Sequence, residues 1–483
     1  MAPVTEPLVL PCGKVVPNRF VKSAMTECLA SPLDHLPTKK HNRLYETWAK
    51  SGVGMIISGN VMVDPLHKES PRNVALYFDV PGEGKEKPDC LSSSRRRAFI
   101  SLASSITSHN NTMAVMQLSH PGRQCPVSVT YKPLAPSAIP VTLPVFGPLL
   151  SRVLFRNPRA LTNTQILEIV NKFKDSAVLA KETGWDGVQI HAAHGYLVSQ
   201  FLSGKANTRT KFYGGSALLR RRFLTEILDK VRNATGPSFV VGLKLNSEDF
   251  QEGGLTTEES MNLLESLCAG GKVDFIEISG GTYEGAEMMD DPKLRAEMRP
   301  STRRREGFFM DFARKVVERR KKKGGALVPI ICTGGFRTRK GIEEALEDVE
   351  MIGMARPLCV DPHFPRRFMA GETDAVIEYS VGFKGTLGKA LSSGLNSFWH
   401  QRQIHRLADG LEPDMAIGYG YALTAMLLRS YLCDPQNHSG AIKMLAMMLG
   451  SALFLKMEQS LALTLGAIFL AYKATTRVKT SSN

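Results

Sequence analysis

Two histidines and a tyrosine stand at the end of a short apolar run in Gly187–Leu197. The run, Gly187–Ile190, is typical of a buried strand, which favours valine and isoleucine over imidazoles. Titratable side chains clustered where a strand ends indicate a site, so His191, His194 and Tyr196 are the leading candidates for chemistry. A pair of hydrogen-bonded structural histidines is the alternative. A metal site is disfavoured, because the sequence offers no matching third ligand and no His-Glu-x-x-His pattern.

Eight apolar runs with polar or glycine-rich exits recur along the chain. They are Phe20–Met25, Val53–Ser58, Met113–Leu118, Gly187–His191, Phe239–Leu245, Val273–Ser279, Val328–Thr333 and Glu350–Ala355. Helical segments lie between them, at Lys39–Lys50, Arg95–His109, Ala217–Asn233, Phe308–Lys323 and Lys340–Glu347, and two more begin at capping boxes, Thr162 with Gln165 and Thr256 with Glu259. This alternation predicts a parallel sheet, and eight units favour a closed α/β fold, the (β/α)8 TIM barrel. A doubly wound open sheet is the alternative, but its glycine-rich turn is missing after the first strand.

In such a barrel the functional residues come from the carboxyl ends of the strands. The expected rim carries amide, hydroxyl, lysine and imidazole groups, a set that suits a planar heterocycle with carbonyls and ring nitrogens better than a metal ion. The last two strands end in Gly334–Gly335 and Ala355–Arg356. Their backbone N–H groups and the guanidinium predict a phosphate site.

Composition narrows the class of protein. The formal charge of +15 is spread along the chain, and its dense run Arg319–Lys323 ends a helix-like segment without interleaved aromatic residues, which disfavours nucleic-acid binding. The eight cysteines are scattered and form no Cys-x-x-Cys pair, which disfavours a zinc ribbon or an iron–sulfur cluster. No signal peptide is evident at the start, so a reducing, cytoplasmic compartment is expected.

The segments outside the repeating units suggest a division of the chain. A proline-rich insertion, Pro121–Pro158, follows the third strand and is expected to form a partial lid over the active face. Helices are expected at Gly394–Ala408 and Met415–Leu432. We therefore expect a barrel in residues 1–375 with an N-terminal hairpin, a helical extension packed on it in residues 376–434, and an apolar tail in residues 435–483.

The tail contains two apolar runs, Met444–Leu455 and Leu461–Tyr472. Each is shorter than the ~20 residues that a membrane-spanning helix needs. Three interpretations stay open: a helical hairpin packed on the barrel, a membrane-surface anchor through residues 440–475, or one marginal span.

Five stretches carry a resemblance to the Old Yellow Enzyme family of FMN-dependent NAD(P)H:flavin oxidoreductases and ene-reductases. They are His191–Ser203, Asn207–Ser216, Glu277–Tyr283, Thr333–Phe336 and Met351–Pro357. Each stretch is weak by itself, but all five occur in the right order and at expected strand exits. The resemblance covers residues 5–410.

The resemblance implies a tightly bound FMN. Thr26 would place its hydroxyl near the O4/N5 edge of the flavin, Gly59 would let the backbone approach the ring, and Gln117 and Lys244 would bind the pyrimidine half. The residues that the resemblance assigns to FMN are Ser23, Ala24, Met25, Thr26, Gly59, Gln117, Lys244, Gly334, Gly335, Ala355 and Arg356. The last four would bind the phosphate.

The resemblance also implies the reaction. NADH or NADPH would deliver a hydride to flavin N5 and leave, and an α,β-unsaturated ketone or aldehyde would then take its place. His191 and His194 would bind the carbonyl oxygen while N5 delivers hydride to the β-carbon and Tyr196 protonates the α-carbon. The residues assigned to substrate binding are Cys28, His191, Ala192, Ala193 and His194.

Some alternatives stay open at this point. One is a flavin-dependent dehydrogenase or isomerase that acts on a single biosynthetic intermediate, and another is a membrane-tethered FMN-binding scaffold. Cys28 stands where one branch of the family has a substrate-contacting tyrosine, which leaves the substrate's shape open. The choice between NADH and NADPH and the formation of homo-oligomers are also open.

Overall fold

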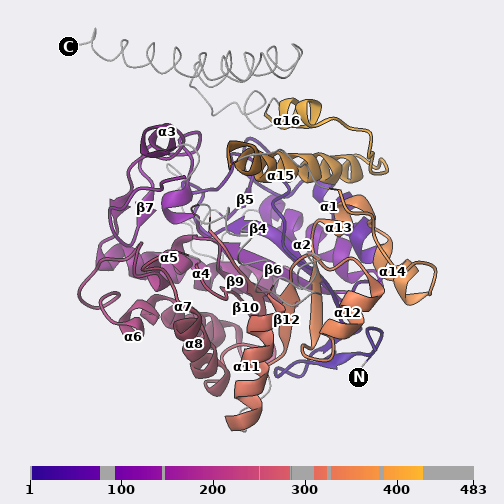
Figure 1. The fold of residues 1–483 in the computed structure, drawn as a ribbon, viewed down its shortest axis with the longest axis horizontal. Coiled ribbons are helices and arrows are strands. Elements are labelled where there is room, and N and C mark those ends of the chain that lie inside the picture. Colours follow the sequence, from indigo (N-terminus) through magenta and orange to yellow (C-terminus); the bar gives the residue numbers. More distant parts are fainter. Residues whose placement is uncertain are drawn as a thin grey trace.

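A closed ring of parallel strands forms the centre of the molecule (Figure 1). The computed structural model describes residues 3–76, 93–143, 147–249, 251–282, 284, 309–323, 328–379 and 386–427. In these residues the ring consists of β3 (Phe20–Lys22), β4 (Met55–Met62), β6 (Met113–Ser119), β9 (Gly187–Ala192), β10 (Val240–Asn246), β11 (Phe275–Ser279), β12 (Ile330–Thr333) and β13 (Met351–Met354). Neighbours pair in the order β3-β13-β12-β11-β10-β9-β6-β4, and the pairing of β3 with β4 closes the ring. The expected (β/α)8 barrel is confirmed.

Helices between the strands cover the outside of the ring. They are α1 (Lys39–Lys50), α2 (Ser93–Thr107), α4 (Asn163–Glu182), α7 (Arg222–Thr235), α8 (Thr257–Ala269), α11 (Met310–Lys323) and α12 (Arg339–Ala345). Both capping boxes are confirmed: Thr162 and Gln165 begin α4, and Thr256 and Glu259 begin α8. The expectation of one helix over Ala217–Asn233 was wrong, because α6 (Ala217–Arg220) ends before α7 begins.

The alternation of side chains along the strands divides the barrel interior into two layers. The lower layer is apolar and contains Val21, Met55, Ile57, Met113, Val115, Val240, Phe275, Ile331 and Met351. Leu10 and Val16 join it from the N-terminal hairpin of β1 (Leu8–Val9) and β2 (Val15–Val16), which therefore closes this end of the barrel. The inward positions beyond this layer are polar, so the candidate functional groups lie at the other end of the barrel.

Helices beyond the last strand pack on the barrel. α13 (Pro357–Val360) and α14 (Phe364–Met369) follow β13, and α15 (Thr386–Ala408) lies across the top of the view, away from the N-terminus (Figure 1). α15 begins earlier than expected, and it contacts α1, α13 and α16 (Tyr419–Leu427). Within the part of the chain that the structure describes, no helix is long and apolar enough to cross a membrane. The runs Met444–Leu455 and Leu461–Tyr472 lie outside the described residues.

Gly353 is an inward position of β13 where the barrel leaves no room for a side chain. A methyl group there would overlap Thr333 Oγ1 and Ser23 Oγ. We expect Gly353→Ala to lower the free energy of unfolding by about 1–3 kcal/mol, the usual cost of overpacking, measured by urea denaturation. Gly270→Ala is the control, because the nearest atoms there are 3.5 Å or more from the added carbon; equal effects of the two substitutions would contradict this account.

Candidate active site

A buried carboxylate organises the polar layer of the barrel. Glu277, on β11, is fully buried and accepts hydrogen bonds from Thr333 Oγ1 at 2.7 Å and Gln189 Nε2 at 2.9 Å, and it pairs with Lys244 Nζ at 3.2 Å. Ser23 Oγ lies 2.8 Å from Thr333 Oγ1 and extends the network to the β3 exit. Burial by itself would raise the pKa of Glu277, but the Lys244 charge and these hydrogen bonds outweigh it and lower the pKa. Glu277 is therefore ionised at neutral pH.

His191, His194 and Tyr196 come together at the exit of β9, as their spacing in the sequence predicts. The chain turns sharply there, with φ of +59° at His194 and +73° at Gly195, before α5 (Leu197–Leu202) begins. The ring centroids of His191 and His194 are 5.0 Å apart, and those of His191 and Tyr196 are 4.7 Å apart. The turn thus gathers three side chains with hydrogen-bond donors at one edge of the barrel.

Both histidines are neutral donors. Burial, followed by the neighbouring His194 and Lys244, holds the pKa of His191 well below its usual range, and burial also lowers the pKa of His194 to about 3. Ala193 N donates to His191 Nδ1 at 3.2 Å, so the neutral ring carries its proton on Nε2. His194 Nε2 lies 2.8 Å from Ser279 Oγ. Ala192 packs in the outer core, so its side chain faces away from this cluster.

The β3 exit loop, Ser23–Thr26, is held by the C-terminal helix α15. Gln401 Nε2 donates to Thr26 O at 3.1 Å, and His405 Nε2 lies 2.7 Å from Glu27 O. The expected strand Phe20–Met25 is shorter in the structure and ends at Lys22. Within the loop, Ala24 packs against the inner core, and Met25 Sδ lies 3.4 Å from Cys359 Sγ.

The exits of β4 and β6 bring the side-chain amides of Asn60 and Gln117 together. Gln117 Nε2 donates to Asn60 Oδ1 at 2.7 Å, whereas Gln117 Oε1 is buried and has no hydrogen-bond partner among the described residues. A methyl group on Gly59 would overlap the Glu27 carboxylate and the Met25 carbonyl, so this glycine accommodates the β3 exit loop.

The two loops that the sequence assigns to the phosphate follow neighbouring strands. Gly334 and Gly335 follow β12, Ala355 and Arg356 follow β13, and these two strands pair in register. Gly335 has a φ of +80°, and Arg356 is exposed at the start of α13. The phosphate site itself stays a prediction.

Cys28 is buried beside the loop that carries Ser70. Its sulfur is 3.1 Å from Ser70 Oγ, and burial raises its pKa to about 12. Cys28 is therefore a thiol at neutral pH.

Two carboxylates of the site were missed in the sequence. Glu277 gave a signal, because it is a charged residue within the otherwise apolar strand Phe275–Ser279. Glu69 lies in the loop after β4, and no pattern in the sequence marks it as a site residue. Glu69 accepts hydrogen bonds from the hydroxyls of Tyr196 and Thr26 and, at 2.9 Å, from Asn60 Nδ2.

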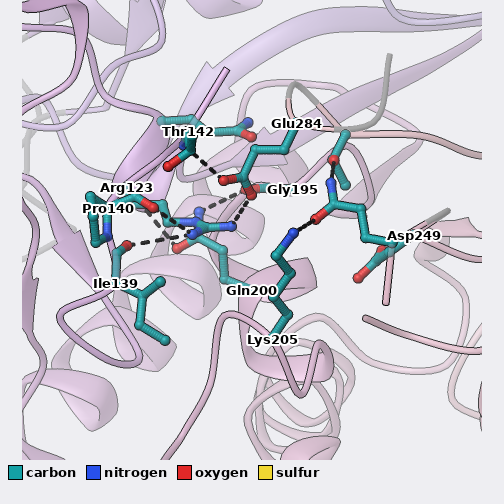
Figure 2. Close-up of polar contacts among 12 residues, drawn as sticks. Arg123, Ile139, Pro140, Thr142, Gly195, Gln200, Lys205, Asp249 and Glu284 are labelled. Atoms are coloured by element: carbon teal, nitrogen blue, oxygen red, sulfur yellow. Dashed lines mark hydrogen bonds and ion pairs between the residues drawn. The ribbon is translucent and has the colours of Figure 1, made fainter. Parts of the chain in front are cut away.

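The insertion after β6 lies against the exits of β9 and β11. It contains η2 (Gly122–Gln124), β7 (Leu134–Ala135) and α3 (Gly147–Leu154). In Figure 2, Arg123 points to Glu284 beyond β11 and donates to the carbonyls of Ile139 and Pro140, at 3.4 and 3.1 Å. Thr142 N donates to the same carboxylate at 2.8 Å. One buried ion pair thus joins the insertion to the loop that borders the site.

Asp64, His67 and His120 also cluster, at the root of the insertion, with one side-chain atom of each within 4.8 Å of the others. Lys172 Nζ lies 2.9 Å from Asp64 Oδ2, and Gly122 N donates to His120 Nδ1 at 3.0 Å. A neutral His120 therefore carries its proton on Nε2, which leaves no lone pair for a metal. Asp64 lies 3.2 Å from His67 Nδ1, and the His67 and His120 rings stack at 5.1 Å, so ring stacking and the Lys172 charge account for the cluster.

Comparison with known proteins identifies the family. A sequence model of the NADH:flavin oxidoreductase / NADH oxidase family matches residues 6–374. The chain belongs to this family. As a member of the NADH:flavin oxidoreductase family, it is an NAD(P)H-dependent flavin oxidoreductase. The match ends at residue 374, so α15 lies beyond it, although the resemblance in the sequence was expected to extend to residue 410.

Two curated relatives share this membership. The chain is 34% identical over 384 residues to the NADH-dependent flavin oxidoreductase nadA of Aspergillus parasiticus, covering 78% of this chain and 80% of that protein. It is 37% identical over 374 residues to the NADH-dependent flavin oxidoreductase iliE of Neonectria sp., covering 75% of this chain. The chain spans about half of iliE, 46% of its length.

A solved structure supports the fold. The Old Yellow Enzyme homologue from Zymomonas mobilis matches with a TM-score of 0.60 at 21% identity, over 81% of this chain and 99% of that protein.

Substitution of Arg123 tests how much its ion pair with Glu284 contributes to the free energy of unfolding. Both side chains are less than 10% exposed, at 6% and 7%. We expect Arg123→Met to lower the free energy of unfolding by about 3–5 kcal/mol, because it leaves a buried carboxylate without its cation. Measured by urea denaturation, the double variant Arg123→Met with Glu284→Leu should recover most of this loss. Lys50→Met, which breaks the exposed pair with Glu46, should cost less than about 1 kcal/mol; a similar cost for Arg123→Met would refute the role of the pair.

Six histidines with a lowered pKa make stability depend on pH. Burial is the largest cause of the lowered pKa of each: about 4 for His35, His41 and His400, about 3 for His120 and His194, and well below the usual range for His191. Below pH ~6.5 the unfolded chain binds protons that the folded chain does not, so stability falls as the pH falls toward 4. Each imidazole adds a slope of up to about 1.4 kcal/mol per pH unit. Urea denaturation across this range should show a smaller slope for His191→Asn, and an unchanged slope would contradict the assignment.

Proposed function

We propose that the chain reduces the activated C=C bond of an α,β-unsaturated carbonyl compound, with FMN as its bound cofactor and NAD(P)H as the hydride donor. The observation that carries the proposal is the gathering of two neutral imidazoles and a phenol beside a polar barrel mouth. Relatives named NADH-dependent flavin oxidoreductases support NADH as a donor.

The donors and acceptors at the barrel mouth fit a flavin. Gln117 Oε1 is a buried acceptor without a partner among the described residues, which suits the ring N–H of a flavin. Lys244 places a cation in the same layer, where it can face a ring oxygen. We assign the ring to Ser23–Thr26, Gly59, Gln117 and Lys244. When bound, FMN accepts a hydride from NAD(P)H and passes it to the substrate.

The phosphate of FMN is assigned to the loops after β12 and β13. Gly334 and Gly335 offer backbone N–H groups without side chains in the way, and Arg356 offers a guanidinium. Ala355 precedes the arginine in the same loop. Because β12 and β13 are neighbours, both loops can contact one phosphate group.

His191 and His194 bind and polarise the substrate carbonyl in this proposal. Because His191 carries its proton on Nε2, it can donate a hydrogen bond to the carbonyl oxygen without a change of charge. Electron density drawn toward the oxygen makes the β-carbon electrophilic. Tyr196, held beside His191, then donates its hydroxyl proton to the α-carbon.

The proposal is tested by measuring flavin reduction and flavin re-oxidation separately in Tyr196→Phe. This variant keeps the ring but lacks the proton, so NADH should reduce its bound flavin within about twofold of the parent rate. Re-oxidation by cyclohexenone should fall by about 10²–10⁴-fold, the usual contribution of a general acid. Rapid-mixing absorbance measures both rates, and Tyr421→Phe, at a residue 60% exposed, is the control. Equal losses in both half-reactions would remove Tyr196 from the role of proton donor, and a purified parent that binds no FMN would refute the function.

A further inference from the structure

Glu69 holds its two carboxylate oxygens in different surroundings. Oε1 accepts hydrogen bonds from Asn60 Nδ2 at 2.9 Å, from Asn73 Nδ2 at 3.1 Å and from the Thr26 hydroxyl. Oε2 faces the Tyr196 hydroxyl and accepts its hydrogen bond. Oε1 thus accepts three hydrogen bonds. Oε2 accepts one, from the phenol that is the proton donor in the proposed function.

The loop that carries Glu69 is fixed by contacts of its own. Ser70 N donates to Asn73 Oδ1 at 2.7 Å, and Lys68 Nζ donates to Pro65 O at 2.8 Å. Cys125 Sγ donates to Lys68 O at 3.0 Å. These contacts place Glu69 beside Tyr196, and Glu69 is half-buried.

The direction of the hydrogen bond between Tyr196 and Glu69 decides what the phenol can do. A phenol has one proton, and while that proton points to Glu69 it is not available to a substrate. A protonated carboxyl has one donor and one acceptor oxygen. Because Oε1 already accepts from three donors, the proton belongs on Oε2. In that state Glu69 donates to the Tyr196 oxygen, and the phenol's own proton no longer points to Glu69.

We propose that Glu69 acts through Tyr196 as the proton reservoir of the site; this inference rests on the proposed function. After hydride has reached the β-carbon, the substrate is an enolate. Its electron pair takes the Tyr196 proton, so that a C–H bond forms at the α-carbon and the phenol O–H bond breaks. The Glu69 Oε2–H bond then breaks as the phenol O–H bond re-forms. The remaining carboxylate regains a proton from water, and Tyr196 is ready for the next turnover.

The three donors on Oε1 also argue against the other obvious role of a carboxylate in a substrate site, which is to bind a cationic substrate. The Asn60, Asn73 and Thr26 donors occupy Oε1, and the Tyr196 hydroxyl occupies Oε2. A ligand ammonium would have to displace one of them. Exchange of a proton along the bond to Tyr196 requires no such displacement.

The first experiment compares Glu69→Gln with the parent flavoprotein. Glutamine keeps the size and an acceptor oxygen for Asn60, Asn73 and Thr26, but it cannot carry the proton. Reduction of the bound flavin by NADH should stay within about twofold of the parent rate. Re-oxidation by cyclohexenone should slow at least about tenfold. Re-oxidation by ferricyanide, which takes electrons and no proton onto carbon, should not change. Glu168→Gln, on the exposed face of α4, is the control and should match the parent.

Each outcome decides the proposal. The proposal is supported if Glu69→Gln is re-oxidised slowly by cyclohexenone but at the parent rate by ferricyanide. Added formic acid should then restore re-oxidation by cyclohexenone in Glu69→Ala. Parent-like re-oxidation of Glu69→Gln overturns it, and so does equal slowing with ferricyanide, because that pattern indicates a structural role.

A second measurement needs no turnover. The tyrosinate absorbance that Tyr196→Phe lacks should appear at lower pH in Glu69→Gln than in the parent, since a carboxylate opposes a negative charge on the neighbouring phenol. An unchanged titration overturns the coupling of Glu69 to Tyr196. If the parent is reduced by NADH but is not re-oxidised by cyclohexenone, the proposed function fails, while this titration still tests the coupling.

Discussion

Glu277 holds a negative charge inside the barrel, where water cannot solvate it, and three other strands of the ring supply the groups that balance it. Lys244 comes from β10, Gln189 from β9 and Thr333 from β12, and Thr333 reaches Ser23 beyond β3. A buried charge without such partners would be very costly. The register of these strands is therefore coupled to the electrostatics of the site, because a slip of one residue would turn a balancing group outward.

The fold and the polar end of the barrel could be predicted because both follow from local patterns. In β9, Val188 and Ile190 pack in the outer core while Gln189 and His191 point inward, so the alternation in the sequence already separates core from site. The gathering of His191 and Tyr196 was predictable for the same reason, since only a tight turn separates them. The ends of strands were predicted less well: β3 ends at Lys22 and not at Met25, although the apolar residues Ala24 and Met25 follow.

Contacts between loops could not be predicted. Glu69 meets Tyr196 across 127 residues, and Arg123 meets Glu284 across 161. No period or motif relates the members of these pairs, because their approach depends on which barrel exits are neighbours and on how each loop bends back. The sequence can therefore name the strands that supply a site while leaving out carboxylates that reach it from the loops.

The hydrogen bonds from α15 to the β3 exit bear on which residues a shortened form of the protein must contain. Gln401 and His405 hold the carbonyls of Thr26 and Glu27, and both lie beyond the segment shared with the family model, which ends at residue 374. A protein trimmed to that shared segment would keep every strand of the ring while releasing two carbonyls at the mouth. A shortened protein that is to keep the β3 exit in this arrangement therefore has to retain α15 up to His405.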